Sequence, residues 1–202
     1  ITNCLFDHCR GLALEQVDGG ILEDVVVSNL VMREVQNTPL FIRLGARLRA
    51  PGQPGPGTVR RIKISHVIAT DVAPEYGLMI VGLPGHPVED VTLSDILVEY
   101  RGGGTVAEAA RTVPEYATDY PEPGPPGRWG PMPAWGAFVR HARHLALIDV
   151  ELRVARPDAR PALRLEDVAG AALVRVRADG GAGARWLEQK DVQSLTTDRP
   201  GE

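Results

Sequence analysis

The chain has 202 residues, of which 44% are apolar and 24% are charged, a composition typical of a folded globular domain. This composition excludes a largely disordered chain and indicates no membrane span. The 22 basic and 26 acidic residues leave a formal net charge of −4, which excludes the strong positive field that binds a nucleic-acid backbone. We therefore expect neither a nucleic acid nor a membrane as partner.

Residues that form turns are abundant, and aromatic residues are few. Only 5% of the residues are aromatic, whereas there are 22 glycines and 17 prolines. A core of aliphatic side chains with many turns favours short strands over long helices. The two cysteines, Cys4 and Cys9, are too few for a disulfide framework or a metal tetrad, so we predict buried thiols without a bound metal.

A short pattern recurs along the chain: an aliphatic residue, two charged residues, three strand-forming positions, a serine, a polar residue and an aliphatic residue. It occupies residues 22–30, 59–67 and 88–96, and weaker copies occupy 144–150 and 172–177. Residues 1–6 match the end of a copy whose beginning is missing. Copies spaced by roughly 25 to 40 residues, outside one long insertion, are typical of solenoids.

Further apolar runs lie between these copies, at residues 40–44, 77–81, 137–140 and 162–165. Each period then contains more than one strand, and stacked periods bury columns of Val, Ile and Leu. We therefore predict an all-β fold, a parallel β-helix over residues 1–188 that is incomplete at its N-terminal end, followed by a frayed polar tail over 189–202. A β-sandwich and a propeller are the alternatives, although the repeats lack Asn-Gly hairpin turns.

Two segments interrupt the repeats. Residues 49–57 are too rich in Pro and Gly for a strand or helix, which predicts an external loop, and residues 101–134 form a much longer insertion. Insertions in solenoids gather on one face, which is often the binding face. Sugar clefts use aromatic rings for stacking and arginines for carboxylates. The candidate sugar-binding residues are Arg43, Arg47, Tyr116, Tyr120, Trp129 and Arg140. Alternatively, the aromatic residues anchor the insertion to the wall of the solenoid.

Adjacent acidic residues occur twice, at Glu23 and Asp24 and again at Glu89 and Asp90. Because both pairs occupy the same place in successive repeats, we interpret them as solvated turn residues and not as a catalytic dyad. Asp7 and His8 lie near the start of the chain, where no partner acid can be named. His86 precedes a proline, a context typical of a turn residue.

Several segments together resemble the C-terminal part of a bacterial member of glycoside hydrolase family 28, the polygalacturonases and related pectin hydrolases. They are NCLFDHCRGLAL at 3–14, VDGGILEDVVVSNLVMREV at 17–35, PLFIRLGARLR at 39–49, YRGGG at 100–104, and PEYATDYPEPGPPGRWGPMPAWGAFVRH at 114–141. The resemblance implies a right-handed parallel β-helix that hydrolyses α-linked galacturonic acid or rhamnose by an inverting mechanism. It implies an extracellular or periplasmic protein with a polysaccharide or oligosaccharide substrate and no cofactor.

The family's catalytic aspartates precede the matching stretch, so the resemblance implies that this chain holds no catalytic residue and is inactive without further N-terminal coils. The family's substrate-binding Arg-Ile-Lys strand falls on Ala13, Leu14 and Glu15, where both basic residues are gone. An acid at Glu15 would repel galacturonate, which favours a neutral sugar or a degenerate site. A non-catalytic carbohydrate-binding or structural β-helix is the alternative function.

Overall fold

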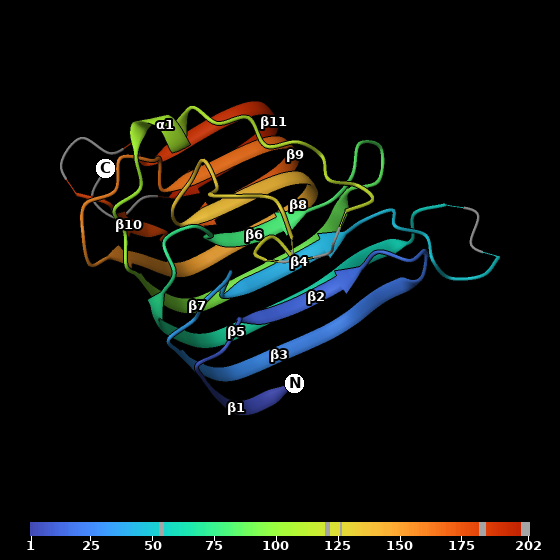
Figure 1. The fold of residues 1–202 in the computed structure, drawn as a ribbon, viewed down its shortest axis with the longest axis horizontal. Coiled ribbons are helices and arrows are strands. Elements are labelled where there is room, and N and C mark those ends of the chain that lie inside the picture. Colours follow the sequence, from blue (N-terminus) through green and yellow to red (C-terminus); the bar gives the residue numbers. More distant parts are fainter. Residues whose placement is uncertain (53–54, 120–121, 126, 182–184, 199–202) are drawn as a thin grey trace.

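A computed structural model describes residues 1–202 except 53–54, 120–121, 126, 182–184 and 199–202 (Figure 1). The described chain is all-β apart from one short helix, α1 (Val106–Ala109), and its eleven strands form one sheet whose named pairings are all parallel. The predicted parallel all-β fold is confirmed. No helix among the described residues is long and apolar enough to cross a membrane.

The strands form two neighbouring runs that merge at the C-terminal end of the sheet. The first run contains β2 (Leu12–Gln16), β4 (Leu40–Leu44) and β6 (Leu78–Val81). The second run contains β1 (Thr2–Asp7), β3 (Ile21–Arg33), β5 (Thr58–Val72) and β7 (Val88–Tyr100). The strands that complete the sheet are β8 (Ala137–Val154), β9 (Leu163–Val174), β10 (Arg177–Asp179) and β11 (Leu187–Asp198). Because β8 pairs with both β6 and β7, the sheet curls into a half-barrel, as in β-helix-like solenoids (Figure 1).

Left-handed residues bend the long strands at regular intervals. Asp24, Asn29 and Glu34 follow one another at intervals of five residues, and all have φ between 50° and 58°. In β5 the corresponding bend residue His66 and the residue before it, Ser65, both lie on the outer side, whereas Val67 is buried. A bend of this kind therefore places two consecutive side chains outside, which a regular strand cannot do. We call such a pair of outward residues a corner.

Neighbouring coils stack their inward residues in columns. Val27, Ile64, Leu93, Leu147 and Leu173 are register partners in successive strands, and each is at most 1% exposed. Burial of one such side chain stabilises the fold by about 1.5–3 kcal/mol. The serines of the three strongest repeats, Ser28, Ser65 and Ser94, also align. The repeat found in the sequence is therefore the physical stacking unit.

Two segments differ from the expectation drawn from their composition. Residues 189–198, expected to belong to a frayed tail, are part of β11, which pairs in parallel with β9 over nearly its whole length. Backbone hydrogen bonding extends the sheet here although most β11 side chains are exposed. Cys4 and Cys9 are free, as expected, but only half-buried, because they lie in the first coil.

The insertion forms a second apolar layer on the outer surface of the first run of strands. Phe41, Met79 and Phe138 project outward from β4, β6 and β8 and pack against residues of the insertion such as Trp129 and Met132. All five side chains are at most 1% exposed. The insertion therefore covers this part of the sheet instead of extending into solvent.

Candidate functional site

Charged side chains follow one outward row across the first run of strands. Glu15 on β2 is the register partner of Arg43 on β4, and Arg140 on β8 is the partner of Glu166 on β9, with Val81 on β6 between the two pairs. Alternate residues of a strand face opposite sides, so these side chains lie on the outer face while their neighbours enter the core. The insertion crosses the middle of the row and leaves its two ends as the places where a ligand could contact charged groups.

The two arginines in the middle of the row hold the insertion. Arg43 is 1% exposed, and its Nη2 donates to the carbonyl of Tyr116 at 2.5 Å. Arg140 is 4% exposed and donates to the carbonyls of Val113 at 2.6 Å and Pro114 at 2.8 Å. Burial lowers the pKa of Arg43 to about 10, against the opposing effect of the nearby carboxylates. Both guanidinium groups therefore donate hydrogen bonds to backbone carbonyls of the insertion.

The aromatic residues of the insertion pack mainly against the protein. Trp129 is completely buried, lies edge-on to Phe41 with ring centroids 5.9 Å apart, and stacks on Tyr116 at 5.1 Å. The Arg43 guanidinium lies 4.7 Å from the Trp129 ring centroid. The structure thus assigns Trp129 the anchoring role considered above, and it leaves no ring face open to a sugar. Tyr116 is half-buried, and Tyr120 lies outside the described residues.

The N-terminal end of the row gathers ionisable groups that the sequence did not connect. Burial and the charge of Glu122 raise the pKa of Glu15 to about 7, although Arg43 and Arg47 oppose the rise. Glu122 comes from the insertion and forms an ion pair with Arg10 at 2.5 Å. This end therefore holds a carboxyl group whose pKa lies near neutral pH, beside the negative charge of Glu122.

Arg47, the remaining candidate, also lies at this end of the row. Its guanidinium donates to both carboxylate oxygens of Asp18, at 3.0 and 2.5 Å. The hydrogen bonds from Arg47 lower the pKa of Asp18 to about 2. Arg47 is partly exposed, so its charge reaches both Glu15 and the surrounding solvent. Of the five candidates that the structure describes, Arg47 and Tyr116 keep an exposed surface.

Glu15→Gln is expected to stabilise the fold at pH 8 by about 1–2 kcal/mol, a value reduced for solvent screening of this half-buried group. The folded-state pKa of about 7 exceeds the usual value of 4.5, so the folded chain binds the proton more tightly. The contribution of Glu15 to stability is complete below pH 4.5 and is lost as the pH rises through 7. Urea unfolding at pH 5 and pH 8 measures the free energy of unfolding of both proteins, with Glu99→Gln as the control at a partly exposed position. Parallel pH profiles for Glu15→Gln and the unmodified chain would contradict the assignment.

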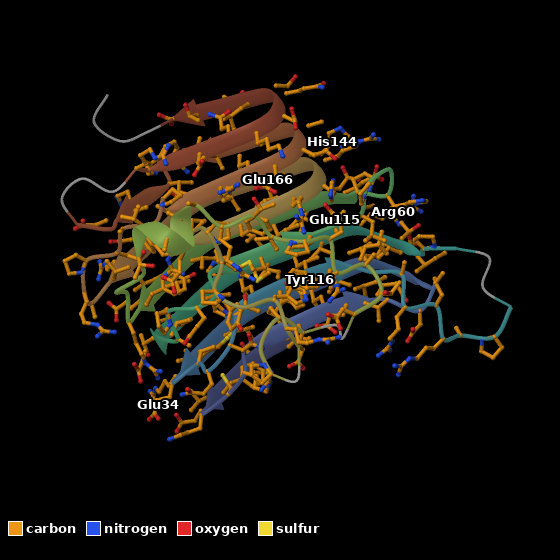
Figure 2. The ribbon with its side chains drawn as sticks, turned by 45° about the horizontal axis from the view of Figure 1, so that its top comes forward. Glu34, Arg60, Glu115, Tyr116, His144 and Glu166 are labelled. Carbon is orange, nitrogen blue, oxygen red and sulfur yellow. The ribbon has the colours of Figure 1, made fainter. Side chains whose placement is uncertain are left out.

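The other end of the row contains an imidazole between two carboxylates. His141 Nδ1 lies 2.6 Å from Asp167, and His141 Nε2 lies 3.0 Å from Glu115 of the insertion. Arg140 lies 3.5 Å from the same Glu115. Figure 2 shows Glu115 near Tyr116 and Glu166 on this side of the molecule. Through Glu115, this cluster attaches the insertion to β8 and β9.

The acidic pairs at the corners are surface residues, as expected. Asp24 accepts two hydrogen bonds from Arg61 of the next coil, and Asp90 lies 3.0 Å from His144. His86 is exposed in a tight turn where Leu83 and His86 exchange backbone hydrogen bonds. No local signal in the sequence identified Glu122 or Glu115, because both reach the sheet from the insertion.

The candidate site is thus an outward row of charged residues. In its middle, Arg43 and Arg140 are buried and bind the insertion, and charged groups gather at both of its ends. Its N-terminal end combines Glu15, Glu122 and Arg47 beside the first coil. Comparison of the chain with family models, with curated proteins and with solved structures finds no match.

Proposed function

We propose that the chain forms the C-terminal coils of a right-handed parallel β-helix that acts on a pectin-type plant cell-wall polysaccharide outside the cytoplasm. The reaction is inverting hydrolysis of an α-linked galacturonic acid or rhamnose unit. The observation that carries the proposal is the N-terminal end of the charged row, where Glu15 and Glu122 lie close to Arg43 and Arg47. A carboxyl group with a raised pKa beside a second carboxylate and two arginines offers the polar groups that a sugar-binding subsite uses.

The first coil supports the proposal that further coils precede it. Pairing between β1 and β3 begins at Thr2 and Ser28, so the first residues of β3 have no partner on that side among the described strands. The inward residues Leu22 and Val25 are only partly buried, whereas their register partners Val59 and Ile62 in the next coil are 0% exposed. A strand that continued β1 backwards in the same register would cover this edge, which a folded solenoid normally does not leave open. These preceding coils would supply the catalytic carboxylates.

The charges near Glu15 favour a neutral sugar at this position. A galacturonate carboxylate placed there would meet Glu15 and Glu122, and like charges in contact oppose binding. Arg43 cannot compensate, because it is 1% exposed and its Nη2 donates to the carbonyl of Tyr116 in the insertion. A neutral rhamnose instead offers hydroxyl groups that Glu15 can bind in either protonation state.

Isothermal titration with rhamnogalacturonan oligosaccharides tests the proposal on the 202-residue chain. We expect weak binding, at least about tenfold reduced in Glu15→Ala, and no hydrolysis of rhamnogalacturonan or polygalacturonate. Glu99→Gln on the other run of strands serves as the control and should bind normally. Hydrolysis by this chain alone would contradict the proposal that the catalytic carboxylates lie in the preceding coils. Absence of glycan binding would overturn the sugar-binding role of this chain.

A non-catalytic carbohydrate-binding or structural β-helix is the second candidate function. It is favoured by the use of Arg43 and Arg140 as anchors of the insertion. The same titration separates the candidates: glycan binding that persists in a protein extended by its preceding coils, without hydrolysis, indicates a binding module. A structural solenoid binds no oligosaccharide in either form.

A further inference from the structure

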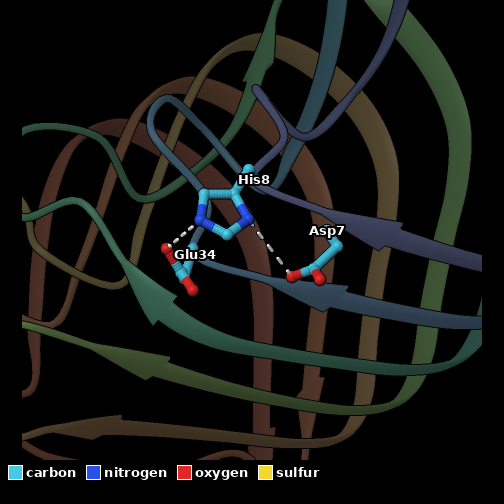
Figure 3. Close-up of side chains that lie close together, drawn as sticks. All are labelled: Asp7, His8 and Glu34. Atoms are coloured by element: carbon cyan, nitrogen blue, oxygen red, sulfur yellow. Dashed lines mark ion pairs between the residues drawn. The ribbon is translucent and has the colours of Figure 1, made fainter.

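The corner at the end of β1 gathers three potential metal ligands (Figure 3). His8 is left-handed, with φ 49°, so Asp7 and His8 form a corner in which consecutive side chains both face solvent. Glu34, with φ 50°, occupies the same corner of the next coil, since Asp7 is the register partner of Arg33. The backbone nitrogen of His8 donates a hydrogen bond to the backbone carbonyl of Arg33 at 3.1 Å, which holds the two corners side by side.

Distances within this corner suit a shared ion. His8 Nε2 lies 2.7 Å from Glu34 Oε2, and His8 Nδ1 lies 3.6 Å from Asp7 Oδ1. One ligand atom from each of the three residues lies within 4.8 Å of the other two. Asp7 and His8 are exposed and Glu34 is half-buried, so modest side-chain rotation would bring one imidazole nitrogen and two carboxylate oxygens onto a single centre.

We propose that Asp7, His8 and Glu34 form a binding site for a divalent transition-metal ion such as Zn²⁺. One imidazole and two carboxylates are donors that Zn²⁺ accepts, and three protein ligands leave a coordination position for water. With a neutral imidazole, the two carboxylates supply two negative charges that favour a cation. Arg33 adds one positive charge nearby, and Arg101, two coils further along, is paired with Asp71 at 2.7 Å.

The same architecture elsewhere in the chain provides the matched comparison. His66 faces one carboxylate, Asp95, at 3.6 Å, and His144 faces one carboxylate, Asp90, at 3.0 Å. Within the part of the chain that the structure describes, Asp7, His8 and Glu34 are the one group of three that meets the spacing for a metal ion. The site therefore depends on a second carboxylate at the corner and not on the corner histidine alone.

Isothermal titration of the chelator-treated 202-residue chain with Zn²⁺ tests the site. We expect one ion per chain and a loss of affinity of at least about tenfold in Glu34→Gln and in His8→Asn, since even an outer-shell partner contributes that much. Asparagine tolerates the left-handed conformation of His8, and circular dichroism verifies that each variant folds. His144→Ala is the control and should keep full affinity.

Substitution of Co²⁺ for Zn²⁺ identifies the donors by their visible absorption. A weak spectrum without a thiolate charge-transfer band is expected for nitrogen and oxygen ligands. A strong thiolate band, abolished in Cys9→Ser, would overturn the proposed ligand set. Equal Zn²⁺ affinity of the unmodified chain and Glu34→Gln, or absence of binding, would also overturn it. None of these outcomes depends on whether the chain binds a polysaccharide.

Discussion

Asp158→Ala is expected to lower the free energy of unfolding by about 3–5 kcal/mol, because it leaves a buried guanidinium without its counter-ion. The Asp158 side chain is 0% exposed and that of Arg160 is 1% exposed. Arg160 donates to the two carboxylate oxygens of Asp158 at 2.9 and 2.7 Å. This is the most deeply buried ion pair found among the described residues, and neither side chain has appreciable contact with solvent.

The pair also joins three separate segments of the chain. Arg160 donates to the carbonyls of Pro74 at 2.6 Å and Met132 at 3.2 Å, and Asp158 accepts from the backbone nitrogen of Gly104 at 2.8 Å. Gly104 lies at the start of the insertion and Met132 near its end. Loss of Asp158 is therefore expected to loosen both ends of the insertion as well as the coil.

Urea unfolding with linear extrapolation measures the loss. Asp149→Asn, which breaks the exposed pair with Arg175 and keeps a residue that tolerates the left-handed conformation, is the control and should lower stability far less. Burial raises the pKa of Asp158 and the hydrogen bonds from Arg160 lower it, with a net downward shift. The stabilisation by Asp158 is therefore present above its unfolded pKa and is lost as the pH falls through the lower folded value. Equal losses in the two variants would contradict the role of the buried pair.

Trp129→Ala is expected to cost about 3–5 kcal/mol, the usual range for truncation of a fully buried Trp. The substitution removes the ring that packs against Phe41, Tyr116 and the Arg43 guanidinium. The cavity left behind separates the insertion from β4, so the carbonyl bound by Arg43 should become accessible. Amide hydrogen exchange of residues 111–119 should accelerate more than exchange in β5 or β7.

Val106→Ala provides the matched control in the same insertion. Val106 is 73% exposed, so its truncation is expected to change the free energy of unfolding by at most about 0.5 kcal/mol. Unchanged stability and unchanged exchange in Trp129→Ala would show that the insertion is not anchored by this residue. Loss of glycan binding in Trp129→Ala at normal stability would instead restore a direct sugar contact.

The parallel stacking could be inferred from the sequence because its cause is local and repeated. The copies at 22–30, 59–67 and 88–96 place inward aliphatic residues at the same positions, and stacking in register buries each column against the next. The surface position of the corner acids could be inferred for the same reason, since Glu23 and Glu89 repeat at one place in the pattern. The positions of the bends could not be predicted from the sequence, because residues of many types adopt the left-handed conformation here, including aspartate, asparagine, histidine, glutamate and arginine.

The roles of the individual charged and aromatic residues required the tertiary structure. Arg43 binds the carbonyl of Tyr116 across 73 residues of sequence, and Arg10 binds Glu122 across 112. Such contacts depend on how the insertion folds back on the sheet, which no periodicity in the insertion predicts. His8 and Glu34 likewise meet only because the register of β1 and β3 aligns two corners. The sequence by itself thus determined the stacked parallel coils, since aliphatic periodicity is a local signal. Only the tertiary structure decided which charges are buried, paired or free to bind a ligand, because those contacts join segments distant in sequence.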